Sequence, residues 1–349
     1  MSQSRVQGNC ELCSRTSDLP RLPTPPRAQL TVPLRHSLRC LSRVLLSVSA
    51  IACLLAFSSQ VSLAQRKPIF VSASFSDRNG LHIDNLNRGE VELLENNQLR
   101  DIELLARNDI PTAFAFLFDT SLAGGTMEGR RRIPGSATSG APAAMEIAFD
   151  LIDRYRGRNL VMIAGYEREI HIALDFTADG FAAKEAVRQL QGTKRLQESF
   201  LYSALFETTR KMSAHRERRR VIIVFLDTLD SRTAAKQANL KNLIAESNVE
   251  LFIVSVASRN TPSNPGLPPT MSRSALRDLC SVTAGDVYFV ADYGDHLEDL
   301  RQRLGRHLQT LYTLGFESES PEDDAARLLI RCLRPGSTVR SHPVVPILR

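Results

Sequence analysis

The sequence predicts an α/β fold with a doubly wound, mainly parallel sheet that has helices on both faces, plus a small β unit. Three observations lead to this prediction. Apolar runs alternate with amphipathic stretches from Ile110 to Leu308, which is the pattern of strands alternating with helices. The apolar runs are unbroken, as in parallel strands that are covered on both faces. The segments on either side are β-like and too short to bury a core alone, so we expect them to pair with each other.

The elements of the α/β region follow in order along the chain. The second and third strands are separated only by Glu167 and Arg168, so we expect a hairpin that adds one antiparallel edge to the sheet. We expect helices where apolar residues recur at helical spacing, as they do after Pro142. The expected strands are 112–118, 159–166, 169–176, 220–226, 249–257 and 286–291. The expected helices are 142–155, 180–191, 199–213, 232–246, 271–283 and 294–309.

These elements divide the chain into four predicted parts. Residues 1–64 form a leader, 66–108 an N-terminal β segment, 109–309 the α/β domain, and 310–343 a C-terminal β segment that pairs with 66–108. Within the first β segment the sequence indicates a turn at 77–80 and a hairpin at Asn96–Asn97.

The leader has the features of an export signal. Arg35, Arg39 and Arg43 precede the apolar stretch 44–57, and Ser62–Ala64 supplies small residues for a signal peptidase. The apolar stretch is shorter than the roughly 20 residues that a membrane-spanning helix needs. We therefore expect cleavage near Ala64, export to the periplasm or the extracellular space, and no stable membrane anchor.

Composition sets limits on the class of partner. The chain of 349 residues is 43% hydrophobic and 23% charged, with a formal charge of +6. The leader holds seven Arg against two acidic residues, which leaves 37 basic and 36 acidic residues in the remainder. This near-neutral charge does not favour binding to nucleic acid.

Two of the six cysteines, Cys280 and Cys332, lie outside the leader. We expect both to be small buried apolar residues rather than disulfide partners.

Polar residues follow two of the predicted strands. Asp119 and Ser121 come after the strand at 112–118, and Asp227 comes after the strand at 220–226. Open parallel sheets bind ligands at the carboxyl ends of their strands, and carboxylate and hydroxyl oxygens are the donors that hard divalent cations prefer. These residues indicate a metal site. The alternative is that each Asp only caps the following helix, which is common after a strand.

The same residues resemble the von Willebrand factor A superfamily, whose metal-ion-dependent adhesion site combines Asp-x-Ser-x-Ser with a distant Thr and a distant Asp. Asp119 and Ser121 match the first two positions, whereas Ala123 stands where the last serine belongs. Ser199 stands in the place of the threonine and keeps its hydroxyl, and Asp227 matches the last carboxylate.

The resemblance runs from about Lys67 to Pro343 and is greatest to the secreted bacterial group called VWFA-related. It implies a non-enzymatic protein-binding module in which Mg²⁺ or Mn²⁺ is held by Asp119, Ser121, Ser199 and Asp227. An open coordination position then takes an acidic residue of an otherwise unknown partner protein. The alternative that stays open is a structural or interaction scaffold that has lost the metal.

The sequence lacks residues that two classes of enzyme require. A haloacid-dehalogenase-like phosphatase, the second alternative, needs a general-acid Asp two residues after the first, and this place is Ser121. A dinucleotide-binding Gly-x-Gly-x-x-Gly motif does not follow the first strand. His171 and His215 belong to no catalytic motif.

Two stretches of the sequence are basic. The segment Gly124–Pro142 is interpreted as a surface insertion, and the run Arg216–Arg220 is interpreted as a solvated helix end.

Overall fold

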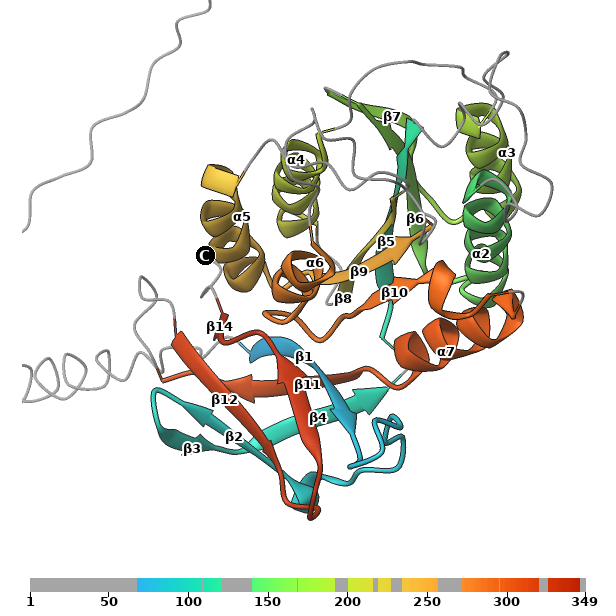
Figure 1. Cartoon of the computed structure of the whole chain (residues 1–349). Helices are drawn as coiled ribbons and strands as arrows, with labels where there is room; N and C mark the ends of the chain where they lie inside the picture. The colour runs from blue at the N-terminus through green and yellow to red at the C-terminus, as the bar shows by residue number, and fades with distance from the viewer. Residues whose placement is uncertain are drawn as a thin grey trace, which may run out of the picture. The chain divides into compact units, whose positions relative to one another are not determined.

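The core of the computed structural model is a six-stranded sheet in the order β10-β9-β8-β5-β6-β7 (Figure 1). The structure describes residues 68–107, 110–120, 140–167, 169–191, 200–215, 219–226, 234–256, 272–294, 296–319 and 326–345. All neighbouring strands are parallel except β7, which pairs antiparallel with β6 as the short Glu167–Arg168 connection predicts. The strands are β5 (Thr112–Asp119), β6 (Leu160–Tyr166), β7 (Ile170–Thr177), β8 (Arg219–Leu226), β9 (Glu250–Ser255) and β10 (Val287–Phe289).

Helices cover both faces of this sheet, because alternate residues of each strand point to opposite sides. In β5, Phe114, Phe116 and Phe118 pack with α2, α3 and α7, whereas Ala113, Ala115 and Leu117 pack with α4, α5 and α6. Figure 1 shows the same division of helices between the two faces. The fold class predicted from the unbroken apolar runs is therefore confirmed. The helices are α2 (Gly140–Arg154), α3 (Gly180–Gln191), α4 (Leu201–Ser213), α5 (Ala234–Ser247), α6 (Arg273–Cys280) and α7 (Leu297–Gln309).

The two flanking segments form two four-stranded antiparallel sheets, in the orders β13-β1-β11-β4 and β14-β12-β2-β3. Strands from opposite ends of the sequence are direct neighbours, since β1 pairs with β11 and β12 pairs with β2. One apolar cluster is built from both sheets. The strands are β1 (Pro68–Ser76), β2 (Val91–Glu95), β3 (Gln98–Arg100), β4 (Ile102–Arg107), β11 (Tyr312–Glu317), β12 (Ala326–Cys332), β13 (Thr338–Ser341) and β14 (Val344–Val345).

The β unit contains the turn at 77–80 and the hairpin at Asn96–Asn97 that the sequence indicates. The Asp77 carboxylate accepts the backbone N–H groups of Asn79 and Leu81. Asn96 and Asn97 have φ values of 48° and 67°, the left-handed conformation that a two-residue hairpin needs at both positions. The β2–β3 register is set by this turn.

The β unit contacts the α/β part at the amino ends of β9 and β10. The buried side chains of His342 and Glu250 approach each other at 3.2 Å between Nε2 and Oε1, and Arg340 pairs with Asp286 at 2.9 Å. Asn248 donates to the Phe70 carbonyl across 2.6 Å. Parallel strands end together, so the carboxyl edge of the sheet, where Asp119 lies, is the opposite edge.

The interpretation of the run Arg216–Arg220 as a solvated helix end is wrong for its last two residues. Arg219 and Arg220 begin β8 and are only 2% and 4% exposed. The Arg219 guanidinium donates to the Leu308 carbonyl at the end of α7, and that of Arg220 donates to the Ser213 carbonyl at the end of α4. Each cation therefore occupies a helix C-terminus, where the helix dipole and unpaired carbonyls favour positive charge.

Cys280 and Cys332 are both free thiols, and Cys280 is fully buried among apolar side chains. No helix within the described ranges is long and apolar enough to cross a membrane.

Candidate metal site at the carboxyl edge of the sheet

The strand order places a topological switch point beside β5. The chain passes from β5 to β6 on one side, and β8 lies on the other side of β5. In open α/β sheets, ligands bind in the crevice outside the strand ends at such a point. β5 ends at Asp119 and β8 ends at Leu226, so the two strands that bound the crevice are those that the sequence analysis singled out.

Asp119 is the one predicted ligand within the described residues. It pairs in register with Tyr166 of β6 and its side chain is buried. A carboxylate removed from water needs hydrogen-bond donors or a cation nearby. An oxygen donor buried at the carboxyl end of the central strand fits the chemistry of a hard divalent cation.

The other three predicted ligands, Ser121, Ser199 and Asp227, lie outside the described residues, and so does Ala123. The structure thus does not place them relative to Asp119. Within the described ranges, no group of three or more His, Cys, Asp or Glu side chains is arranged to hold a metal ion.

A set of hydrogen bonds connects the described neighbours of these positions. The Thr120 hydroxyl donates to Glu167 Oε1 across 2.8 Å and lies 3.1 Å from the Tyr166 carbonyl. The backbone N–H of Phe200 donates to the Glu167 carbonyl across 2.7 Å. Glu167 therefore connects the residue that follows Asp119 with the residue that follows Ser199.

Glu167 is a residue that sequence reasoning missed. In the sequence, Glu167 is interpreted only as part of a short connection between two strands. The available signal was its position directly after Tyr166, because a residue at the carboxyl end of β6 lies at the same edge as the end of its parallel neighbour β5. A carboxylate there lies at the same edge of the sheet as Asp119, and it accepts the hydroxyl hydrogen of the next residue, Thr120.

Of the two histidines considered from the sequence, His171 pairs with Gly165 near the carboxyl end of β6, one strand removed from β5, and His215 lies beyond the end of α4. His171 is an exposed residue of β7. The His215 ring, just beyond the end of α4, packs against Phe176 with ring centroids 4.2 Å apart. Neither is placed as a general base beside Asp119.

No protein-family model matches the sequence, and neither does any curated protein. Solved structures do match at low identity. A von Willebrand factor type A protein from Catenulispora acidiphila is 13% identical with a TM-score of 0.44, over 80% of this chain and 74% of that chain. An aerotolerance-related membrane protein from Bacteroides fragilis is 12% identical with a TM-score of 0.42, over 57% of this chain and 98% of that one.

Proximal thread matrix protein 1 from the mussel byssus, in a structure with a zinc-occupied MIDAS motif, is also similar. It is 12% identical with a TM-score of 0.43, over 60% of this chain and 48% of that chain. This chain therefore spans about half of the mussel protein. At this level of similarity, the fold class rests on the strand order and pairing observed in this chain.

Proposed function

We propose that this chain is an exported, non-enzymatic protein-binding module with a divalent cation site at the carboxyl edge of its sheet. The observation that supports this most is the position of Asp119. It is a buried carboxylate at the end of the central strand, beside the switch point between β5 and β8. Ligand sites in open α/β sheets occur at this place.

The ligands would be Asp119, Ser121, Ser199 and Asp227, and the cation Mg²⁺ or Mn²⁺. Carboxylate and hydroxyl oxygens suit both ions, and Mg²⁺ keeps water where the protein supplies few donors. Ala123 removes one hydroxyl from the set, which we expect to weaken binding without changing the kind of ion. A bound cation with an open coordination position would attract a carboxylate of a partner protein.

The described residues contribute by fixing the crevice. Glu167 accepts the Thr120 hydroxyl hydrogen and the Phe200 backbone N–H through two different groups. These two contacts connect Thr120, which follows Asp119, and Phe200, which follows Ser199, to the hairpin between β6 and β7. Preorganised donors lose less conformational entropy when a ligand binds.

The second candidate function is a metal-free interaction scaffold of the same fold. Two observations favour it. Asp119 is 0% exposed, and a carboxylate that is satisfied inside the protein does not need a cation. Ala123 also replaces a serine of the pattern that the sequence resembles.

Calorimetric titration of the full chain with MnCl₂ and MgCl₂ distinguishes the two candidates. We expect saturable binding to the wild type and its loss in Asp119→Asn and in Asp227→Ala. Asp101→Asn is the matched control, since Asp101 is an exposed carboxylate in the β unit. Absence of binding at millimolar Mn²⁺, in protein that melts cooperatively, would reject the metal site and leave the scaffold.

A further inference from the structure

One face of the sheet β14-β12-β2-β3 carries a row of exposed leucines. Leu94 of β2 lies opposite Leu329 of β12 and, on its other side, opposite Leu99 of β3. Residues that lie opposite each other in an antiparallel pair share a face, so the three side chains are neighbours. Leu329 and Leu99 are 43% and 64% exposed. None of the three leucines belongs to an apolar cluster that the described residues form.

This row departs from the alternation expected of an antiparallel sheet that faces water. The other face of the same strands supplies Leu93 and Ile330 to the apolar cluster of the β unit, so the outer face should be polar. Within the described ranges, seven large apolar side chains are exposed, and three of them belong to this sheet or directly follow β12: Leu99, Leu329 and Leu333. Apolar side chains gathered on one exposed face indicate an interaction site.

Charged side chains lie beside the row on the same face. Arg331 of β12 is directly opposite Glu92 of β2, and both are two positions along their strands from the leucines, which places them on the same side of the sheet. Neither side chain forms an ion pair or hydrogen bond with another described residue. This face therefore carries an unpaired positive charge on β12 and an unpaired negative charge on β2.

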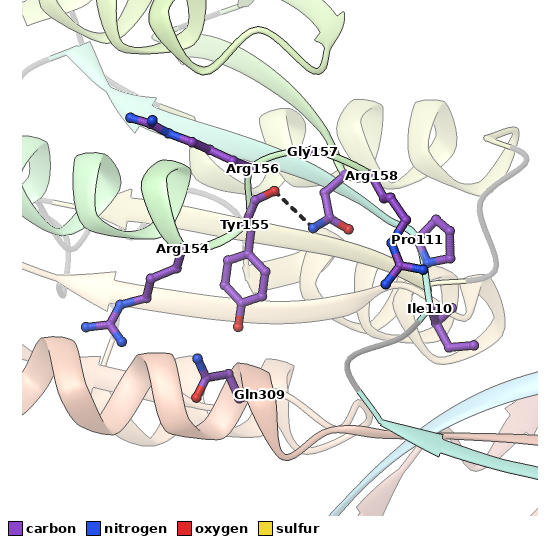
Figure 2. A pocket seen from close by; sticks show the side chains of 9 residues that line it. Ile110, Pro111, Arg154, Tyr155, Arg156, Gly157, Arg158 and Gln309 are labelled. Atoms are coloured by element: carbon purple, nitrogen blue, oxygen red, sulfur yellow. Dashed lines mark hydrogen bonds between the residues drawn. The ribbon is translucent and has the colours of Figure 1, made fainter.

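Arginines that line a cavity at the end of α2 differ from Arg331 in this respect. The cavity has a volume of ≈ 360 Å³. There Arg154 pairs with Asp150 across 2.6 Å, and Arg156 pairs with Asp153. Figure 2 shows the Arg154 and Arg156 side chains pointing in different directions, so the cavity does not bring them to one ligand.

The pattern on the outer face of β2 and β12 is complementary to itself. A second copy can be generated by a rotation of 180° about an axis that runs parallel to the strands, midway between β2 and β12 and outside the face. Leu329 then lies over Leu94 of the second copy, and Arg331 lies over Glu92 of the second copy. Each contact occurs twice, because a twofold interface uses the same patch on both copies. The strands of the two sheets run in nearly the same direction, which is a common arrangement for packed sheets.

We propose that two copies of this chain associate through this face, with Leu94 and Leu329 at the centre and Arg331 paired with Glu92 of the other copy. An apolar centre with charged residues around it is the usual composition of a protein interface. The face is small, since its longest strand, β12, has seven residues. Small interfaces are typical of weak and transient complexes, so we expect a dissociation constant in the micromolar range.

The dimer would leave the candidate cation site accessible. The β unit contacts the α/β part at the amino ends of β9 and β10, whereas Asp119 ends β5 at the opposite edge of the sheet. Two copies would therefore present two such edges, and a partner with two binding segments would be held more tightly than by one copy. Association through β2 and β12 does not depend on whether a cation binds at Asp119.

Sedimentation equilibrium of the full chain over a range of protein concentrations tests the proposal. We expect a monomer–dimer equilibrium in the wild type. Leu329→Gln should weaken the dimer about tenfold or more, since each copy loses an apolar side chain from the interface. Leu81→Gln is the matched control, because Leu81 is an exposed leucine in a turn of the same β unit, and its dissociation constant should equal that of the wild type.

Exchange of charge tests the orientation of the two copies. Arg331→Glu and Glu92→Arg should each weaken the dimer, because each places like charges opposite each other in both copies. An equimolar mixture of the two variants should recover dimerisation, since both contacts between the different variants then join opposite charges. Repulsion within one chain is not relieved by mixing, so this recovery isolates the contact between copies. Arg210→Glu, at an exposed position of α4, is the charge control and should dimerise as the wild type does.

Three results would overturn the proposal. The first is a wild type that stays monomeric at high micromolar concentration, which would leave the face to a partner of another kind. The second is a dimer of unchanged affinity in Leu329→Gln. The third is a failure of the two charge variants to associate when mixed, provided that their melting temperatures show both to be folded.

Discussion

Thr120 donates its hydroxyl hydrogen to the Glu167 carboxylate across 2.8 Å, and this bond connects the end of β5 to the hairpin that follows β6. The contact is local in space but spans 47 positions in sequence. It lies next to Asp119 at the carboxyl edge of the sheet. The same Glu167 accepts the Phe200 N–H through its backbone.

Replacing Glu167 with Ala should therefore affect the proposed cation site more than the fold. The substitution removes the acceptor for Thr120 and leaves the backbone contact with Phe200 in place. We expect a stability loss of about 1 kcal/mol, the net value of one such hydrogen bond, and a severalfold weaker affinity for Mn²⁺. Urea unfolding and calorimetric titration measure the two effects separately.

Glu169→Ala is the control for that experiment, since Glu169 belongs to the same hairpin and is exposed. Glu167→Gln should restore much of the lost affinity, because an amide oxygen can also accept the Thr120 hydrogen. An equal loss of Mn²⁺ affinity in the Glu169 variant would contradict a positioning role for Glu167.

Ala123→Ser should tighten cation binding. The substitution supplies the one hydroxyl that the sequence lacks relative to the pattern it resembles, and Mg²⁺ and Mn²⁺ take oxygen ligands. We expect at least a severalfold gain in affinity for Mn²⁺ by calorimetry. Ala123→Val, which adds bulk without oxygen, should not give this gain; if both variants bind equally, a direct hydroxyl ligand is excluded.

The sheet could be predicted because its strands are strongly apolar and buried on both faces. The predicted strand at 112–118 differs from β5 by one residue, since the run of apolar residues stops where Asp119 begins. Arg219 and Arg220 were misread because their burial depends on carbonyls of distant helices. A charged run alone contains no information about such partners.

The candidate site could be predicted less completely. Asp119 was found because a carboxylate after an unbroken apolar run is visible in the sequence. Glu167 was missed because its importance depends on β6 lying beside β5 in parallel register, a tertiary relationship.

Export should remove the leader. The order of arginines, apolar stretch and Ser62–Ala64 predicts cleavage after Ala64. Mass spectrometry of protein recovered from the periplasm or the medium should find Gln65 at the N-terminus. Replacing Ala64 with Arg should block processing, because a signal peptidase needs a small residue there. Recovery of the intact chain in the cytoplasm would contradict the prediction.

Acidification should destabilise the fold through His307. Its Nε2–H donates to the Ala284 carbonyl across 3.0 Å, and Nδ1 lies 2.8 Å from the Tyr288 hydroxyl. Both ring nitrogens of His307 therefore have hydrogen-bond partners. Burial lowers the pKa of His307 well below its ordinary value, and the His82 ring stacked on it, with centroids 3.9 Å apart, lowers it further.

The surroundings of His307 give little support to a second proton. Ser74 Oγ lies 3.1 Å from Nε2, the Phe252 ring packs edge-on, and the charges of Arg340 and Arg219 also lower the pKa of His307. For His82, burial is the main cause of a lowered pKa, opposed by the charge of Asp286. Both rings therefore favour the neutral form in the folded state.

The direction of the pH effect follows from linkage. An unfolded chain protonates His307 near pH about 6.5, whereas the folded protein does so only at lower pH. The contribution of His307 to the free energy of unfolding is therefore fully present above that pH. It falls as the pH decreases toward the folded pKa, by up to about 1.4 kcal/mol per pH unit for each such histidine.

Urea unfolding at pH 7.5 and 5.5 should show this loss. His307→Gln keeps a donor for the Ala284 carbonyl and should reduce the loss, whereas His171→Gln, at an exposed position of β7, should leave it unchanged. An identical pH dependence in wild type and His307→Gln would exclude His307 as its source.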